Sequence, residues 1–411
     1  MLKSIHNKNK FKEEKQMKIK FKKEKGITLV ALVVTIVVLI ILAGITLSLV
    51  LGQNGIVNKA KEARDKTQAD QLNTEIAMNT LYNDMEGAIS AGPIDLSKVN
   101  TVKEAKENRA IPIADNKTLT DDNTKTVIVP AGFKIASDSA TTVNAGIVIE
   151  DKDGNQYVWI PVDNISDYKR TTFSTNVATG TIDTSTNSEK INYSSSDTNY
   201  FTEAMPSDEL ASVTTYKGYY IGRYEAGDSV STANKTLRSD GASINNKVAI
   251  KKDQAPYNWI TRDQAKTLAE EIKTTEGYTK GTTKLCSSYA WDTAINFIQR
   301  TNTDYGASSG EGNYNDTTFS YTDITGATQT KASGTSTLVL TGQTTSVSNI
   351  YDMGGNDWEW TTEISSDASA TCVQRGGYYG NNLATCPSGL RTRTNTTYSF
   401  AYSNFRATLY L

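Results

Sequence analysis

The strongest pattern in the sequence is an uncharged apolar run at residues 27–51, ITLVALVVTIVVLIILAGITLSLVL. As a helix this run would be about 37 Å long, which is enough to cross a bilayer. Residues 1–25 carry ten lysines and three glutamates, so the positive-inside rule keeps them in the cytoplasm and places the rest of the chain outside. The pattern predicts a single-pass cell-membrane protein with an extracellular C-terminal domain. The alternative, a secretory signal, would have a shorter apolar core and a small-residue cleavage site.

Residues 56–85 predict a helix that continues away from the membrane, because apolar side chains recur weakly along a polar stretch. Residues 87–124 hold glycines, prolines and the polar run NKTLTDDNTKT, which indicate a linker or a small irregular cap. The predicted organisation is therefore a leader at 1–26, a transmembrane and stalk helix at 27–86, a linker at 87–124 and a C-terminal domain at 125–411.

The predicted domain at 125–411 begins with strand patterns. The runs VIVPAGF and IVIE, the turn at 151–155 and the run YVWIP predict a strand followed by a hairpin, with Trp159 in the core. Tyr219–Glu225 predicts a further strand. Between these strands, residues 164–215 are rich in Ser, Thr and Asn, and they indicate a surface insertion.

Two helical patterns follow the strands. The first covers residues 255–272 and is capped by Thr261 with Gln264 three positions later, which is a capping-box spacing. The second covers residues 287–298, with apolar side chains at helical spacing. Short strands combined with two helices, without a βαβ series, predict the α+β class.

Composition excludes several kinds of site. The only histidine is His6 in the leader, which excludes Ser-His-Asp and Cys-His nucleophile pairs and histidine-based zinc sites from the C-terminal domain. The net charge is −2 and the chain beyond residue 25 is acidic, so it offers no basic surface for nucleic acid. Cys286, Cys372 and Cys386 lack CxxC spacing; a Cys372–Cys386 disulfide and buried free thiols both fit the sequence.

The junction before the apolar run reads Lys25-Gly26-Ile27-Thr28-Leu29-Val30 and resembles the type IV prepilin signal. This resemblance implies a processing site between Gly26 and Ile27, with the new N-terminus starting the membrane helix. Pilins usually carry a glutamate at the fifth residue of the mature chain, where this chain has Ala31. The resemblance implies membrane anchoring and makes other pilin-like subunits candidate partners.

A second resemblance covers residues 125–411. The segments YVWIPV, GRYEAG, NWITRDQAKTLAEEI, KLCSSYAWDTAINFI, YDMGGNDWEWT, RGG and NFRATLYL occur there in this order. Together they resemble the formylglycine-generating-enzyme-like (sulfatase-modifying factor) domain, a member of the C-type lectin fold. The most specific part is DMGGNDWEW followed by RGG and a final FR.

The enzymes of this family hold Cu(I) between two cysteine thiolates that follow RGG, because soft thiolates suit that ion. In this chain the nearer position falls at about Asn381, and only Cys386 stands near the other. One thiol does not make such a site, so we expect no copper and no enzyme activity of this type.

The turn at 352–359 combines acidic side chains with two glycines, a composition that suits a structural Ca²⁺. The family resemblance implies side-chain oxygens of Asp352 and Glu359 and main-chain oxygens of Gly355 and Asp357 as ligands. The alternative is a turn without metal, in which Asn356 and Glu359 bond the backbone and a tryptophan of the segment packs in the core.

The run between RGG and the final FR is dominated by Tyr, Asn, Ser, Thr and Arg. Tyrosine gives large, rigid contact area at low entropy cost, while Ser, Thr and Asn give adaptable hydrogen bonds. We predict a ligand-binding face here; the alternative is a solvated, irregular polar surface. Its members are Tyr378, Tyr379, Asn381, Asn382, Thr385, Arg391, Arg393, Asn395, Thr397, Tyr398, Phe400, Tyr402 and Ser403. The run also resembles the variable segment of proteins diversified by retroelements, where Asn, Tyr, Ser, Thr and Cys are among the residues that mutagenised adenine codons yield.

These features predict a membrane-anchored, surface-displayed ligand-binding protein, an adhesin or receptor, and not an enzyme. The expected partners are the membrane, an extracellular protein or glycan ligand, and other pilin-like subunits, but not nucleic acid. The alternative function is a minor pilin or pseudopilin in a type IV filament or secretion system. A copper-dependent enzyme of the formylglycine-generating type ranks third.

Overall fold

The computed structural model describes residues 33–38, 98–109, 111, 114–173, 190–192, 198–307 and 311–411. The chain divides into two compact units, residues 1–89 and 90–411. In the first unit, residues 33–38 are helical and their side chains are exposed. The predicted leader, the Gly26–Ile27 processing site, most of the apolar run and the stalk helix lie outside the described residues. Among the helices that the structure does describe, none has the length and apolarity needed to cross a membrane.

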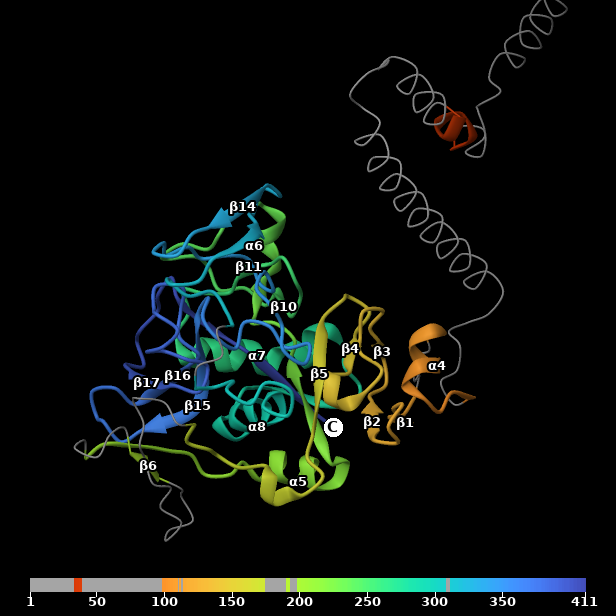
Figure 1. The fold of residues 1–411 in the computed structure, drawn as a ribbon, viewed down its shortest axis with the longest axis horizontal. Coiled ribbons are helices and arrows are strands. Elements are labelled where there is room, and N and C mark those ends of the chain that lie inside the picture. Colours follow the sequence, from red (N-terminus) through yellow and green to blue (C-terminus); the bar gives the residue numbers. More distant parts are fainter. Residues whose placement is uncertain are drawn as a thin grey trace, which may run out of the picture. The chain divides into compact units, whose positions relative to one another are not determined.

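The second unit combines short helices with many short strands (Figure 1). Its helices are α4 (Val102–Glu107), α5 (Ser207–Tyr216), α6 (Ser229–Ala233), α7 (Arg262–Glu276) and α8 (Ser288–Ile298), with 3-10 turns η2 (Val143–Ala145) and η3 (Ile165–Asp167). Its strands are β1 (Lys117–Thr120), β2 (Thr126–Val129), β3 (Lys134–Ile135), β4 (Val148–Glu150), β5 (Gln156–Pro161), β6 (Lys190–Asn192), β7 (Tyr200–Thr202), β8 (Gly218–Gly222), β9 (Gly227–Asp228), β10 (Val248–Ala249), β11 (Ala255–Pro256), β12 (Thr282–Leu285), β13 (Phe319–Thr322), β14 (Thr328–Lys331), β15 (Trp358–Ser365), β16 (Cys372–Arg375), β17 (Arg391–Thr394), β18 (Ser403–Phe405) and β19 (Ala407–Tyr410).

Two larger sheets organise this unit. The first has the strand order β12-β19-β8-β5-β4-β3, and the second has the order β17-β16-β15-β7-β6 with β18 added alongside β15. The neighbouring strands run antiparallel except for the parallel pair of β15 and β18. Smaller sheets are β1-β2, β10-β9-β11 and β13-β14. This mixed, sheet-rich arrangement is the α+β organisation predicted from short strands combined with two helices.

The first sheet is buried on both faces. Along β5, Tyr157 and Trp159 join one hydrophobic cluster, while Val158 and Ile160 join the other, because successive strand side chains point to opposite faces. Buried apolar side chains of α7 belong to the first cluster, and those of α8 belong to the second. The two predicted helices therefore contribute to opposite layers of the core. Trp159, predicted to be core, is 1% exposed.

Local signals place the boundaries of these elements. The Asp151 carboxylate accepts hydrogen bonds from the backbone N–H groups of Asp153 and Asn155, which closes the β4–β5 hairpin at the predicted turn. Thr261 and Gln264 form the predicted capping box at the start of α7. The Ser287 hydroxyl accepts from the N–H of Ala290 at the start of α8.

The described part of residues 87–124 is folded, so the prediction of a linker there is wrong. Val102 and Ala105 on α4 and Leu119 on β1 are buried in the same cluster as Trp159. The polar run that suggested a linker contains β1 and a tight turn, in which the Asp121 carboxylate accepts from three backbone N–H groups. In this run the Asp121 side chain accepts hydrogen bonds from backbone N–H groups, and the apolar side chain of Leu119 is buried.

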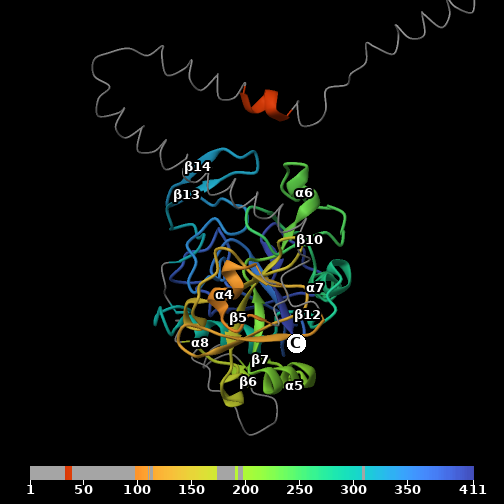
Figure 2. The same cartoon turned by 90° about the vertical axis from the view of Figure 1, so that its right-hand side faces the viewer.

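The described part of residues 164–215 is also more than a surface insertion. Strand β7 pairs with β15, β6 pairs with β7, and Val213 of α5 is buried in the core cluster that contains α8. In two perpendicular views α5 lies at the end of the unit opposite the β13–β14 hairpin (Figure 1; Figure 2). The Ser/Thr/Asn-rich composition suggested a surface insertion because β6 and β7 contain few apolar side chains. Those that they do contain, Ile191 and Phe201, pack with Val373 in a small separate cluster.

We expect Thr261→Ala to lower the free energy of unfolding by about 1 kcal/mol, because it removes the side-chain acceptor at the start of α7. Thr267→Ala is the matched control. It makes the same truncation at an exposed interior position of the helix, where alanine is the better helix former. Chemical denaturation of both variants measures the difference, and equal effects would contradict the role of the cap.

Candidate functional site

The segment from Tyr351 to Trp360 is a buried turn that leads into β15. Asp352, Gly355 and Asn356 all adopt positive φ angles in it. At Gly355 the backbone passes so close to Asn313 that an added Cβ would lie 2.3 Å from the Asn313 carbonyl oxygen. A glycine is therefore required at position 355, and the asparagine at 356 is a residue type that tolerates the positive φ angle there.

This turn holds two loops of the C-terminal run in place. The Asn356 carbonyl accepts the backbone N–H of Tyr379 at 2.9 Å, and the Trp358 N–H donates to the Tyr402 carbonyl at 2.8 Å. Directly beyond these bonds, β18 pairs in parallel with β15, with Trp358 opposite Ser403. We call residues 351–360 the scaffold turn, because both loops are hydrogen-bonded to it.

Five aromatic side chains of these loops form a continuous series, which we call the aromatic row: Tyr379, Tyr378, Tyr402, Phe400 and Tyr398. Successive ring centroids are 5.2, 4.5, 5.1 and 4.9 Å apart, distances at which aromatic rings attract one another. Tyr398 is 44% exposed and the other four rings are half-buried. The row therefore presents apolar surface to solvent on a supported backbone.

Two residues outside the predicted set complete this support. The Trp259 N–H donates to the Phe400 carbonyl at 3.0 Å, and the Asn258 side-chain amide donates to the Ala401 carbonyl at 2.5 Å. Their partners lie more than 140 residues away in the sequence, and nothing in the local pattern around them signals the contact.

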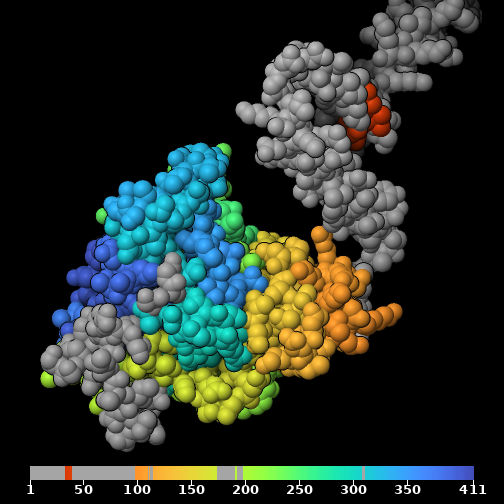
Figure 3. Space-filling view, viewed as in Figure 1, coloured from red at the N-terminus to blue at the C-terminus, as the bar shows by residue number. Residues whose placement is uncertain are grey.

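Several predicted members lie beside the aromatic row. The Asn381 side chain accepts from the Tyr378 N–H at 3.1 Å, and its carbonyl accepts from the N–H of Asn315. Figure 3 shows the surface of the 311–345 region directly next to that of the C-terminal segment. Asn382, Thr385 and Thr397 are exposed, while Asn395 is half-buried and accepts from the N–H and hydroxyl of Thr397. Arg393 is half-buried and pairs with Asp367 at 3.1 Å.

Two predicted members do not belong to an exposed face. Ser403 is fully buried in β18, where its hydroxyl accepts from the Gln374 side-chain amide at 2.8 Å. Arg391 is 2% exposed and its guanidinium is engaged by acidic groups inside the domain. Their residue types suggested surface contacts, but both side chains make their polar contacts inside the domain.

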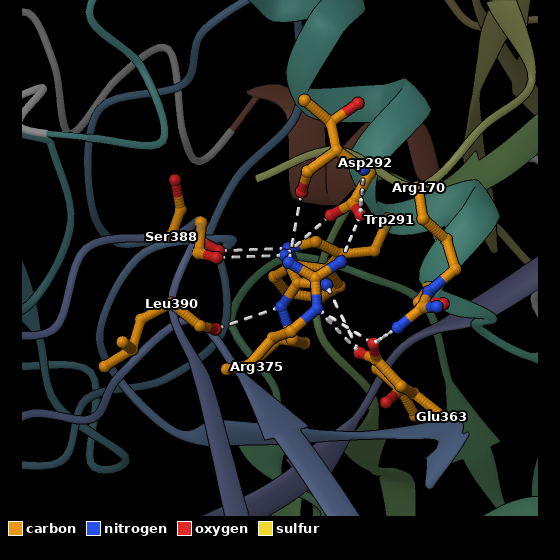
Figure 4. A network of polar contacts seen from close by, with 12 residues as sticks. Arg170, Trp291, Asp292, Glu363, Arg375, Ser388 and Leu390 are labelled. Atoms are coloured by element: carbon orange, nitrogen blue, oxygen red, sulfur yellow. Dashed lines mark hydrogen bonds and ion pairs between the residues drawn. The ribbon is translucent and has the colours of Figure 1, made fainter. Parts of the chain in front are cut away.

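Arg391 belongs to a buried network with Arg170, Arg375, Asp292 and Glu363 (Figure 4). Arg391 binds both carboxylate oxygens of Glu363 at 2.9 and 3.0 Å and also contacts Asp292. Arg375 donates to Asp292 at 2.7 Å and to the Leu390 carbonyl at 2.9 Å. Burial alone raises the pKa of Glu363, but Arg391, Arg170 and Arg375 together lower it to about 2. The network therefore holds ionised groups in the interior.

The predicted calcium ligands Asp352 and Glu359 have internal partners. Both carboxylate oxygens of Glu359 accept from Arg406, at 2.9 and 2.6 Å, and the pair is fully buried. Asp352 accepts from the Gly342 N–H at 2.6 Å and from the Thr344 hydroxyl. Because these oxygens are engaged, the predicted ligand set does not fit a calcium ion. The two tryptophans of the motif are buried, and the Trp360 indole donates to the Ile260 carbonyl at 3.1 Å.

The cysteines are free thiols, so of the two alternatives the structure has no Cys372–Cys386 disulfide. Cys286 and Cys372 are buried, and burial raises the pKa of the half-buried Cys386 thiol. Within the part of the chain that the structure describes, no three His, Cys, Asp or Glu side chains are arranged to hold a metal ion.

No protein-family model matches the chain, and no curated protein matches it. Three solved structures with low similarity are PvdO from Pseudomonas aeruginosa, Treponema denticola variable protein 1 and CarF. PvdO has a TM-score of 0.35 and 15% identity, over 64% of this chain and 98% of PvdO. The Treponema protein has a TM-score of 0.30 and 13% identity, over 63% of this chain and 96% of that one. CarF has a TM-score of 0.28 and 12% identity, over 47% and 87%. At TM-scores below 0.5 these likenesses carry no argument, and the proposals below rest on this chain's own residues.

We expect Glu363→Gln to lower the free energy of unfolding by about 3–5 kcal/mol, because it leaves buried guanidinium groups without their carboxylate. Asp367→Asn is the control, since it breaks the partly exposed pair with Arg393, which contributes about 1 kcal/mol or less. Urea denaturation compares the two, and a small effect of Glu363→Gln would show that the network contributes little.

The same carboxyl group predicts an acid dependence. Because the pKa of Glu363 is lowered to about 2 from the ordinary 4.5, the unfolded chain takes up its proton first as the pH falls. The stabilisation from this group is complete above pH 4.5 and is lost as the pH falls towards 2. Glu363→Gln should therefore be less stable at pH 7 and show a shallower loss of stability over this window in acid titration. Parallel curves for the two proteins would contradict this assignment.

Proposed function

We propose that residues 90–411 form an extracellular ligand-binding domain whose aromatic row contacts a protein or glycan. The observation that supports this most directly is the row itself, because five rings stay partly exposed on two loops fixed to the scaffold turn. Rigid aromatic groups lose little conformational entropy on binding, and residues of this kind dominate the energetics of many interfaces.

The residues around the aromatic row indicate which kinds of interaction a ligand would make with it. Residues 376–390 and 394–405 contain no charged side chain, so the two loops that carry the row bring no charge of their own to it. The exposed Asp316 carboxylate, which accepts from the Leu383 N–H, is a charged group that borders them. Exposed hydroxyl and amide groups of Asn382, Thr385 and Thr397 border it. Binding at such a surface uses ring contacts and neutral hydrogen bonds, and it should depend little on salt concentration.

The loops also fit the proposed relationship to retroelement-diversified domains of the C-type lectin fold. Backbone hydrogen bonds, rather than side chains, fix the positions of Tyr379, Phe400 and Tyr402. Side chains at these positions can therefore change without loss of the main-chain contacts. Diversification would be confined to the exposed positions, because Arg391 and Ser403 are buried.

Display at the cell surface is part of the proposal. The apolar run at 27–51, preceded by the lysine-rich leader, supports a single-pass anchor with the domain outside the cell. The Gly26–Ile27 junction favours a second candidate, a minor pilin or pseudopilin, and co-purification with filaments would support that role instead. We propose that the domain binds its ligand without catalysing a reaction on it, since Asn381 stands at about the position where the copper-binding enzymes carry the first of two cysteines.

We expect Tyr398→Ala and Tyr402→Ala to weaken ligand binding by about 30-fold each, the effect of removing a central aromatic contact. The full-length chain is screened against a protein and glycan array, and the affinity of each hit is then measured for both variants. Tyr321→Ala is the matched control, because Tyr321 is a half-buried tyrosine on β13 outside the row. Unchanged affinity of every hit for both row variants would show that ligands bind elsewhere.

A further inference from the structure

A surface cavity of about 290 Å³, which we call the α8 cavity, lies between α8 and the segment that follows η3. Pro161, at the end of β5, and Phe297, on α8, are buried and form its apolar side. No residue of the aromatic row lines it. A concave site that combines apolar surface with a few polar groups is typical of small-molecule binding.

One wall of the α8 cavity is a single face of the helix. Thr293, Asn296 and Phe297 line it at the i, i+3 and i+4 spacing that places side chains on one face. Arg300 continues this face just after the helix ends, where its backbone N–H donates to the Phe297 carbonyl at 3.1 Å. The guanidinium carbon of Arg300 lies 5.5 Å from the centroid of the Phe297 ring, within the range of a cation–π contact. This contact holds the guanidinium close to the apolar side of the cavity.

The opposite wall is held in place by the interior of the domain. Along residues 167–171, Tyr168 and Arg170 are buried, whereas Lys169 and Thr171 line the cavity. Tyr168 packs in the core cluster that contains α8, and Arg170 belongs to the buried ion-pair network. The two buried side chains therefore fix the backbone from which Lys169 and Thr171 reach the cavity.

Hydrogen bonds between the two walls leave one neutral donor available. The Asn296 side-chain amide donates to the Thr171 hydroxyl at 3.2 Å, and the Thr293 hydroxyl donates to the Asp167 carbonyl at 3.4 Å. A hydroxyl that accepts one bond can still donate its own proton, and the Thr171 hydroxyl donates to no acceptor among the described residues. An oxygen of a ligand in the cavity would therefore find a donor at Thr171.

The cavity also carries an excess of positive charge. Lys169 and Arg300 are exposed, and in the part of the chain that the structure describes neither forms an ion pair with a carboxylate. Asp167 is the only acidic residue that lines the cavity. Two cations beside one carboxylate favour an anionic ligand, whereas the loops of the aromatic row contain no charged side chain.

We propose that the α8 cavity binds an acidic monosaccharide, with Lys169 and Arg300 on its carboxylate and the Thr171 hydroxyl on a ring oxygen substituent. Hydrogen bonds between cationic donors and a carboxylate are stronger than neutral ones, and the planar guanidinium matches a carboxylate in shape. The carbon-bound hydrogens of the sugar ring would lie against Pro161 and Phe297. A bare sulfate or phosphate ion would fill only part of the cavity and would leave this apolar side without contact.

The test is isothermal titration of the purified full-length chain with D-glucuronic acid and with N-acetylneuraminic acid. D-glucose and sodium sulfate serve as the neutral-sugar and bare-anion probes. We expect at least one acidic sugar to bind with a dissociation constant of about 1 mM, as for a ligand of this size. Binding should weaken as NaCl is added, and the two control probes should bind at least tenfold more weakly.

Variants assign the binding to this cavity. Lys169→Ala and Arg300→Ala should each weaken the affinity about tenfold, because each removes a charge-assisted hydrogen bond. Asp167→Asn should tighten it about threefold, because it removes the only carboxylate of the cavity. Lys103→Ala is the matched control, since Lys103 is an exposed lysine on α4 outside the cavity.

The inference does not depend on the proposed function of the aromatic row, because the two surfaces share no residue. Tyr398→Ala should therefore leave the affinity for the acidic sugar unchanged. The proposal is overturned if neither acidic sugar binds, or if glucose or sulfate binds as tightly as they do. It is also overturned if Tyr398→Ala abolishes binding while Lys169→Ala and Arg300→Ala keep it, since the sugar would then bind at the row.

Discussion

The C-terminal domain depends on the buried network in which Arg170, Arg375 and Arg391 share the carboxylates of Asp292 and Glu363. These groups come from the segment after η3, from α8 and from β15, β16 and β17, so one set of ion pairs fixes five parts of the chain. Moving such charges out of water is costly, and the cost is offset only when every partner is in position. The network therefore favours one arrangement of the loops that follow β16 and β17.

In the loops that follow this network, the backbone and the side chains have separate roles. Main-chain bonds from Asn356, Trp358 and Trp259 hold the loops, while the rings of the aromatic row contact one another and solvent. The C-terminal run thus contains both interior positions, such as Ser403, and exposed ones, such as Tyr398. A surface that recognises a partner needs this separation, because its side chains can change only if the backbone beneath them does not rely on them.

Local signals in the sequence were sufficient for α7, α8 and the β4–β5 hairpin, since their capping and turn contacts span only a few residues. The roles of Arg391 and Ser403 were not predictable in this way. Arg391 pairs with Glu363 and Asp292, 28 and 99 residues away, and an arginine is usually exposed unless it is paired. The same limit applies to β6, β7 and β1, whose polar residues resemble loop sequence until their partner strands are known. For the aromatic row, residue types predicted all five rings but not their contacts with one another.

The position of β19 has a consequence for synthesis. This strand lies between β12 and β8 in the six-stranded sheet, although it follows both of them by more than a hundred residues. The sheet cannot close until Ala407–Tyr410 has been made, so the domain must finish folding after the exposed loops have left the ribosome. A chain interrupted by a stop codon or a frameshift within those loops lacks the strand. Such a chain leaves the edges of β12 and β8 unpaired, and the cell's quality control can remove it.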